Sequence, residues 1–326
     1  MGLNCDAGCA GLFLFDPSGR GIQATGFSIM PAYSLYRTDY PRCLSQPINM
    51  TQHPSTPAGL YPLCDLNLAR RLERTEGAAN ASYVVARARL SPESGAEWIQ
   101  VAGVYAMFDG PQSPLTQTFG LGLFDPVGDE EFHIIESFFR KRGAHVHHEV
   151  SPLIAPELVA QLTRRGYHPL EYSNVLVRPI AGGVVAGESA TEVRLIEPHE
   201  AELWAQTATK GWRTESEELA TFIREFGLIM ARADGARCFL AFLDGQPVAA
   251  GALFIHGDVA LFAGASTIPA ARRRGAQLAL LKARLDFAEA AGVELAMMVA
   301  QPGSASHRNS ERQGFHVVYT RTKWEL

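Results

Sequence analysis

The chain has 326 residues, which is enough for about two domains of ordinary size. Hydrophobic residues make up 47% of it and charged residues 19%, proportions typical of a soluble globular protein with sizeable cores. The formal net charge of −5 argues against a general nucleic-acid binder, and no apolar run is long enough to span a membrane.

The first 60 residues differ in composition from the rest. Residues 16–63 are rich in Pro, Ser, Thr and Gly and show no sustained periodicity, so residues 1–60 are predicted to be irregular or disordered. Met50 is a hypothetical alternative start, because the patterned sequence begins near Asp65. The five cysteines are odd in number and scattered, which predicts ordinary thiols in a reducing compartment, the cytoplasm, rather than a disulfide framework.

Residues 61–180 are predicted to form a first lobe that alternates helices and strands. Apolar spacing predicts helices over Asp65–Glu73, Glu130–Arg142 and Pro156–Arg165, and strands over Tyr83–Leu90, Trp98–Phe108, His145–Val150 and Tyr167–Arg178. Alternation along the third strand places His145, His147 and Glu149 on one face. Such a set could hold a metal, but we interpret it as a half-exposed strand and predict no metal site.

A glycine-rich, unpatterned linker is predicted at residues 181–189, followed by a second lobe over residues 190–326. Helices are predicted over Pro198–Lys210, Ser216–Ala233 and Gln277–Ala291, and strands over Cys238–Leu243, Val248–Ile255, Val259–Ser266 and Val293–Ala300. Asp244-Gly245 is a strong hairpin turn between the first two of these strands.

The turn between Val259–Ser266 and the helix after it is the most informative part of the chain. Residues 272–275 read Arg-Arg-Arg-Gly. The first amides of a helix have no partner within the helix and carry partial positive charge, so they attract anions. Gly275 permits close approach of the backbone and the three arginines add formal charge, so the turn predicts a diphosphate site.

The spacing of three pairs of glycines indicates that the chain contains the same fold twice. Gly103 and Gly251 are 148 residues apart, as are Gly166 and Gly314, and the Gly143–Gly292 pair is 149 apart. In the first lobe, the place of the arginine turn is taken by residues 123–126, Leu-Phe-Asp-Pro, whose acid repels a diphosphate. We therefore expect tandem lobes, of which the first has lost its anion site.

The strand, arginine turn, helix and strand of the second lobe resemble motif A of the GNAT acyltransferase superfamily, Q/R-x-x-G-x-G/A. Arg272 takes the Q/R place and Gly275 the first Gly, while Gln277 stands where the family usually has Gly or Ala. Gly314-Phe315 after a short helix matches the family's closing segment, and Asn309 lies in that helix. The resemblance covers roughly residues 190–326.

This resemblance implies a mixed α/β (α+β) fold of two tandem GNAT-like lobes, each a mainly antiparallel mixed sheet flanked by helices, the first lobe degenerate. It implies an N-acyltransferase that moves an acetyl group from acetyl-CoA to a primary amine of a small molecule or peptide. The residues implied to bind the cofactor are Ala265, Ser266, Thr267, Arg272, Arg273, Arg274, Gly275, Ala276, Gln277 and Asn309.

The residues for catalysis and for the acceptor are less well marked. Where the family often has a Tyr that protonates the thiolate, four residues before Gly314, this chain has Ser310, which we take as the candidate catalytic residue. Ser310 could act through water, Tyr319 or Ser304 could replace it, or protonation could be left to solvent. Trp212 follows Gly211 in the region that lines the family's acceptor site, although a buried core Trp fits equally well.

Two other functions stay open at this point. The missing Tyr also fits a non-catalytic CoA-binding or interaction module. Some tandem GNAT-like proteins use aminoacyl-tRNA as donor, against which the intact arginine turn and the acidic net charge argue. A homodimer is possible, and no nucleic acid or membrane partner is expected.

Overall fold

The computed structural model describes residues 61–181, 191–212 and 217–326. The predictions for residues 1–60, for a start at Met50 and for the linker beyond residue 181 lie outside the described residues. Leu63–Leu326 belong to one compact unit. The boundaries between lobes therefore stay predictions, and the two halves are described below by their elements.

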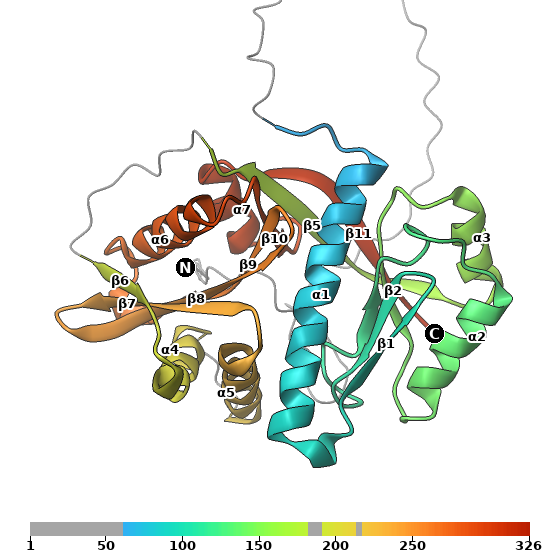
Figure 1. Ribbon diagram of the computed structural model, residues 1–326, viewed down its shortest axis with the longest axis horizontal. Coiled ribbons are helices and arrows are strands. Elements are labelled where there is room, and N and C mark those ends of the chain that lie inside the picture. The colour runs from blue at the N-terminus through green and yellow to red at the C-terminus, as the bar shows by residue number, and fades with distance from the viewer. Residues whose placement is uncertain (1–60, 182–190, 213–216) are drawn as a thin grey trace, which may run out of the picture. The chain divides into compact units, whose positions relative to one another are not determined.

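Eleven strands form a single sheet. In chain order they are β1 (Glu97–Val101), β2 (Val104–Phe108), β3 (Gln117–Phe119), β4 (His147–Val150), β5 (His168–Pro179), β6 (Glu192–Leu195), β7 (Ala236–Leu243), β8 (Gln246–His256), β9 (Val259–Thr267), β10 (Leu295–Ala300) and β11 (His316–Glu325). The α-helices are α1 (Leu66–Leu90), α2 (Asp129–Arg140), α3 (Pro156–Arg164), α4 (Ala201–Trp212), α5 (Glu217–Arg232), α6 (Ala276–Ala290) and α7 (Ala305–Arg312). The fold is thus mixed α/β, as expected (Figure 1).

The last strand of each half is exchanged with that of the other half. The sheet order is β1-β2-β3-β4-β11-β5-β10-β9-β8-β7-β6, so β11 lies next to β4, and β5 lies next to β10. The two exchanged strands pair antiparallel with each other over nearly their whole length. Instead of two separate sheets, the halves share one continuous sheet.

The central β5–β11 pair is built around a pseudo-twofold axis. His168 pairs with Glu325, Arg321 with Ser173, and His316 with Val177. The 148-residue spacing makes His168 of the first half equivalent to His316 of the second half. It also makes Ser173 equivalent to Arg321, the residue with which Ser173 pairs. The axis therefore passes close to the Ser173–Arg321 pair, which is the arrangement of an isologous interface between two equal units.

Helix α1 corrects the prediction of a strand over Tyr83–Leu90. The helix predicted from Asp65 does not stop at Glu73. It is 25 residues long and ends at Leu90. Its start is capped by Asp65, whose carboxylate accepts a hydrogen bond from the Leu68 amide at 2.8 Å. Buried residues recur along it at helical spacing, namely Leu68, Leu72, Thr75, Ala79, Tyr83 and Ala86. Packing against the sheet outweighs the β propensity of Tyr83-Val84-Val85.

Two smaller differences occur after α1. The strand predicted over Trp98–Phe108 is a hairpin, in which Ala102 and Gly103 both adopt positive φ to turn β1 into β2. The short strand β3 had no sequence prediction. It is only three residues long, too short for an alternating pattern to show.

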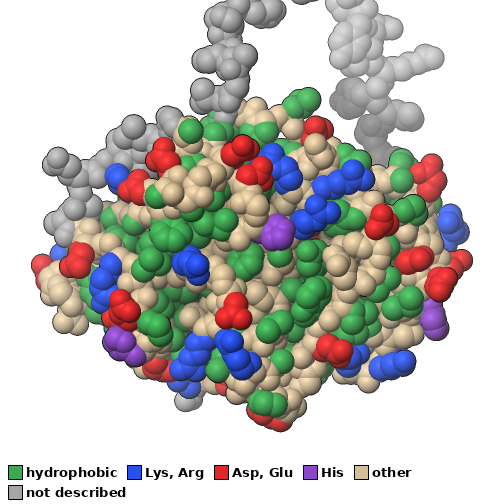
Figure 2. All heavy atoms as spheres, in the orientation of Figure 1, with side chains coloured by type: hydrophobic (Ala, Val, Ile, Leu, Met, Phe, Trp, Pro, Cys, Tyr) green, Lys and Arg blue, Asp and Glu red, His purple; other side chains and the backbone are tan. Residues whose placement is uncertain are grey.

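The helices lie on both faces of the sheet. In the second half, α6 packs against β6–β9, and α4 packs against β8 and β9 from the other face (Figure 1). Acidic and basic side chains are interspersed over the face drawn in Figure 2. None of the helices in the described ranges is long and apolar enough to cross a membrane.

Candidate active site

The candidate site begins where two parallel strands separate. Among the described residues, β9 and β10 pair only at Val259–Leu261 with Leu295–Met297. Beyond that point β9 keeps its partner β8, and an irregularity in the register at Gly264, whose φ is 62°, bends it. A cavity of about 390 Å³ lies along the separated ends of the two strands, under α6 and α7.

The cavity gathers most of the residues predicted from the sequence. Its predicted members are Ala265, Thr267, Arg272, Arg273, Gly275, Ala276, Gln277, Asn309 and Ser310. Ser266 and Arg274 belong to the same turn but do not line the cavity. Trp212 ends α4 half-buried and also lies outside the lining.

The N-terminus of α6 opens onto this cavity without a cap. Its N-cap residue is Gly275, with φ of 82°, and no side chain caps the first amides. Those amides point out of the helix end with the positive end of the dipole behind them. The equivalent helix of the first half, α2, differs in charge, because its first turn holds three acids, of which Glu131 accepts a hydrogen bond from the Gly128 amide at 2.8 Å.

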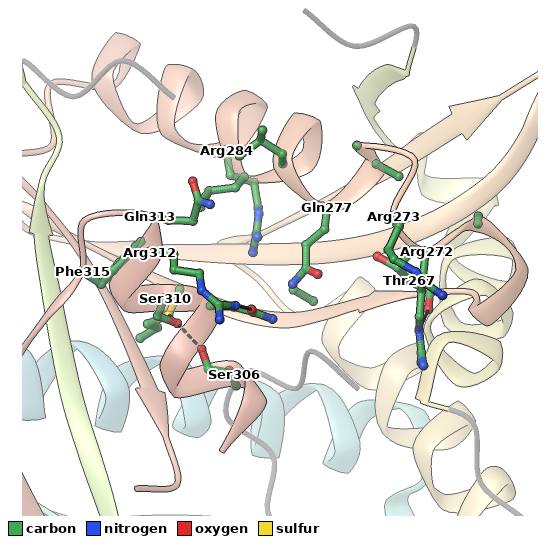
Figure 3. A pocket seen from close by; sticks show the side chains of 18 residues that line it. Thr267, Arg272, Arg273, Gln277, Arg284, Ser306, Ser310, Arg312, Gln313 and Phe315 are labelled. Atoms are coloured by element: carbon green, nitrogen blue, oxygen red, sulfur yellow. Dashed lines mark hydrogen bonds between the residues drawn. The ribbon is translucent and has the colours of Figure 1, made fainter. Parts of the chain in front are cut away.

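The three arginines of the turn separate in the structure. Arg272 donates hydrogen bonds to the carbonyl oxygens of Thr267 at 3.2 Å and Gly211 at 3.0 Å, which ties the end of β9 to the end of α4. Arg274 points to Asp244, 3.3 Å away, in an exposed ion pair. Arg273 is exposed, has a positive φ of 62° and lines the cavity (Figure 3). It is the arginine of the turn best placed to meet an anion there.

Alternation along β9 sends neighbouring side chains to opposite faces. The Ser266 hydroxyl donates a hydrogen bond to the Ala208 carbonyl of α4 at 3.0 Å, on the face away from the cavity. Thr267 lines the cavity, and its buried Oγ1 has no hydrogen-bond partner among the described residues. A buried hydroxyl without a partner costs free energy, so Thr267 is suited to a polar group of a ligand.

None of the three hydroxyls considered for catalysis is free. Ser310 is buried in the cavity wall and donates a hydrogen bond to the Ser306 carbonyl at 2.8 Å (Figure 3). Ser304 caps α7 by accepting from the His307 amide at 3.1 Å. Tyr319 donates to Glu73 at 2.8 Å in a buried ionic cluster and does not line the cavity.

Several lining residues were not predicted from the sequence. Arg284 of α6, Arg312 and Gln313 from the end of α7, and Met298 of β10 all contribute to the cavity. Only Arg284 carried a signal, since it occupies the inward position between Leu280 and Ala288 on an otherwise apolar helix face.

The histidines of the first half lie far along the sheet, on and beside β4. His145 and His147 both approach the Glu325 carboxylate, at 3.2 and 3.4 Å. His148 is buried between Thr118 and Tyr167, and this burial lowers its pKa to about 3, which keeps the ring neutral. Within the described ranges, no group of His, Cys, Asp and Glu side chains has the arrangement of a metal site.

One family model matches part of the chain. Residues 181–302 match the family model of the acetyltransferase (GNAT) domain. These residues are similar to a GNAT domain. This family indicates an acyltransferase that uses an acyl-CoA donor. No curated protein matches the sequence.

Solved structures match over more of the chain. A GCN5-related N-acetyltransferase from Kribbella flavida is 20% identical, with a TM-score of 0.54 over 75% of this chain and 95% of that one. A tandem GNAT protein from the clavulanic acid biosynthesis pathway is 17% identical, with a TM-score of 0.49 over 69% of this chain and 78% of that one. A GCN5-related N-acetyltransferase from Sphaerobacter thermophilus is 17% identical, with a TM-score of 0.45 over 64% and 71%. The first of these shows the GNAT fold.

Proposed function

We propose that this protein transfers an acyl group from acyl-CoA, with acetyl-CoA as the simplest donor, to a primary amine of a small molecule or peptide. The observation that carries the proposal is the uncapped N-terminus of α6, which opens into the cavity between the separated ends of β9 and β10. Phosphate groups bind at such helix ends.

The residues around the cavity fit coenzyme A. The amides of Ala276 and Gln277, with the side chain of Arg273, would hold the diphosphate. The unpartnered hydroxyl of Thr267 would meet a polar group farther along the donor. The free edge of β9 offers backbone groups to an extended chain laid beside it.

The donor supplies an activated carbonyl: the amine nitrogen forms the C–N bond, the C–S bond breaks, and the proton lost by nitrogen goes to the leaving sulfur or to solvent. The protein's main contribution is position, because holding an amine beside a thioester already supplies much of the rate. Ser310 stays the candidate proton donor. To act, its hydroxyl must give up the hydrogen bond to Ser306.

The first half, we propose, does not bind CoA. The first turn of its helix α2 carries three acids, and Phe124 packs directly over Gly103 and Gly120, where a Cβ would lie only 2.5 and 2.4 Å from the Phe124 side chain. Arg74 covers the other side of Phe124, with 4.6 Å between its Cζ atom and the ring centroid. This half would brace the second half and shape the acceptor site.

Location and assembly belong to the same proposal. Cys64 and Cys238 are free thiols, which fits a reducing compartment such as the cytoplasm. A homodimer stays a prediction.

Calorimetric titration with acetyl-CoA tests the cofactor, and Gly275→Glu tests the site. This substitution places a carboxylate at the helix end and strains a positive φ, so we expect affinity to fall about 100-fold or more. The matched control is Gly292→Glu, since Gly292 also has a positive φ, of 75°, follows the other end of α6 and has open space around it.

If Gly275→Glu binds acetyl-CoA like the unmodified protein, the site is wrongly assigned. If the folded protein binds acetyl-CoA but no amine in a broad panel is acylated, the result favours the alternative function, a non-catalytic CoA-binding module.

A further inference from the structure

Arg284 is a buried cation on the inner face of α6. Its side chain is only 2% exposed and lies between the helix and the sheet. Nε donates a hydrogen bond to the Leu280 carbonyl at 3.2 Å, and Nη1 donates to the Ala252 carbonyl of β8 at 3.1 Å. The guanidinium sits over the Phe262 ring, with 5.0 Å from Cζ to the ring centroid. Gly251 leaves room for it, because a Cβ there would lie 3.2 Å from Cζ.

No carboxylate in the described part of the chain neutralises this charge. Arg284 takes part in no ion pair there, and its Nη2 makes no hydrogen bond. Burial lowers the pKa of Arg284 to about 10. Arg321, which is equally buried, is surrounded by Glu73, Glu76 and Glu149. An unpaired buried charge is costly, so one that is retained calls for a partner from outside the chain.

Arg284 lines the same cavity as the anion site. A helical rise of about 1.5 Å per residue places it about 13 Å along α6 from Gly275. Figure 3 shows its side chain pointing from α6 into the space that Gln277 and Arg312 also face. The lining between Arg273 and Arg284 includes an apolar section of Leu281, Met298 and Phe315, beside polar side chains such as Gln277 and Ser310.

We infer that Arg284 binds a carboxylate at the far end of the donor's acyl chain, so that the protein prefers a dicarboxylic acid monothioester of CoA, such as succinyl-CoA, over a neutral acyl-CoA. This inference rests on the proposed function. A ligand anchored by its diphosphate at Gly275 and extended along the free edge of β9 runs beneath α6, and Arg284 lies over Phe262 of the same strand. A planar guanidinium suits a carboxylate, and Nη2 is free to donate to it.

The carboxylate belongs to the donor rather than to the acceptor because Arg284 shares one helix, and one continuous cavity, with the diphosphate end. The acyl chain crosses the apolar section, and only its terminal group needs a charged partner. The thioester reaction itself is unchanged, since the carboxylate neither gains nor loses a bond.

The test compares calorimetric affinities for succinyl-CoA, butyryl-CoA and acetyl-CoA. Succinyl and butyryl groups have the same number of carbons and differ in the terminal carboxylate. We expect the unmodified protein to bind succinyl-CoA about 10- to 100-fold more tightly than butyryl-CoA, the range for a charge-assisted contact. Arg284→Met should abolish this ratio, and Arg284→Lys should keep part of it.

Lys282→Met is the matched control, because Lys282 lies on the exposed side of the same helix and pairs with Asp286 at 2.6 Å. It should leave the ratio unchanged. Equal affinity of the unmodified protein for succinyl-CoA and butyryl-CoA overturns the inference, even if Arg284→Met fails to fold. If acetyl-CoA binds and no preference appears, the proposed function survives without the inference; if no thioester binds, the proposed function itself fails.

Discussion

Residues of one chemical type serve different ends here because their surroundings differ. Arg272 donates hydrogen bonds to two backbone carbonyls, Arg274 forms an exposed ion pair, and Arg273 faces the cavity. Two buried arginines, Arg321 and Arg284, also differ in their partners. Arg321 is held by carboxylates, whereas the described residues that hold Arg284 offer it carbonyls and an aromatic ring.

Glu73 predicts a pH dependence of stability. Its burial raises its pKa to about 7 from the ordinary 4.5, despite the opposing charge of Arg321. Because the folded protein binds this proton more tightly than the unfolded chain, the stabilisation is complete below pH 4.5 and is lost as pH rises through about 7. Glu76, Glu149 and Tyr319 surround the same carboxyl.

Glu73→Gln keeps the group neutral at every pH. Between pH 5 and 8, the unmodified protein should therefore lose more unfolding free energy than the variant does, by about 3 kcal/mol. Urea denaturation of both proteins across this range checks it. Parallel stability curves for the two proteins would show that the carboxyl of Glu73 does not titrate as described.

At the scale of the element, the ends of two corresponding helices differ in charge. Helix α6 begins at a glycine with no acid in its first turn, whereas the first turn of α2 holds three acids, which is why we propose an anion site only for α6. In helix α1, by contrast, packing against distant residues overrides the local sequence preference. Its last eight residues favour a strand by composition, yet they stay helical because the sheet covers their apolar face.

Gly77 in the middle of α1 predicts an unusual response. Alanine normally stabilises a helix by about 1 kcal/mol relative to glycine. Here a Cβ would lie 2.6 Å from Cδ2 of Tyr105, so Gly77→Ala should instead destabilise the protein by about 1–3 kcal/mol. Thermal and urea denaturation measure this. Combining it with Tyr105→Leu should cost less than the sum of the two changes, and strict additivity would exclude the clash.

At the scale of the whole molecule, the exchange of β5 and β11 makes the two halves depend on each other. β10 finds its second partner in β5, and β11 lies between β4 and β5, so both strands of the second half pair with the first half. Removing either half exposes long unpaired strand edges, which are prone to aggregate.

The second half alone, residues 190–326, should accordingly fail to give a soluble folded monomer. Co-expressed with residues 61–181, it should form a stable complex that again binds acetyl-CoA. Size-exclusion chromatography and circular dichroism check the first outcome, and calorimetry the second. A monomeric, cooperatively unfolding second half would show that the exchanged strands are dispensable.

Prediction from the sequence succeeded best where structure is local. The hairpin at Asp244-Gly245, the strand before Arg272 and the helix after Gly275 follow from turn chemistry and periodicity within a few residues. It failed for Tyr83–Leu90, where distant packing decides, and for β3, which is too short to show a pattern. For the site, Arg273, Gly275 and Gln277 line one cavity, whereas Ser266 turns to the other face, and their part in cofactor binding stays a prediction.

The amino-acid sequence by itself determined the α/β class and the GNAT resemblance and predicted an anion site at the arginine turn, because these depend on a glycine, its neighbouring charges and the periodicity on each side. Only the tertiary structure decided that the halves share one sheet, that Arg272 ties α4 to β9, and that Arg284 reaches the cavity of Arg273 without a counter-ion from the described residues. Each of these depends on groups that are distant in sequence, and their placement follows from packing rather than from local pattern.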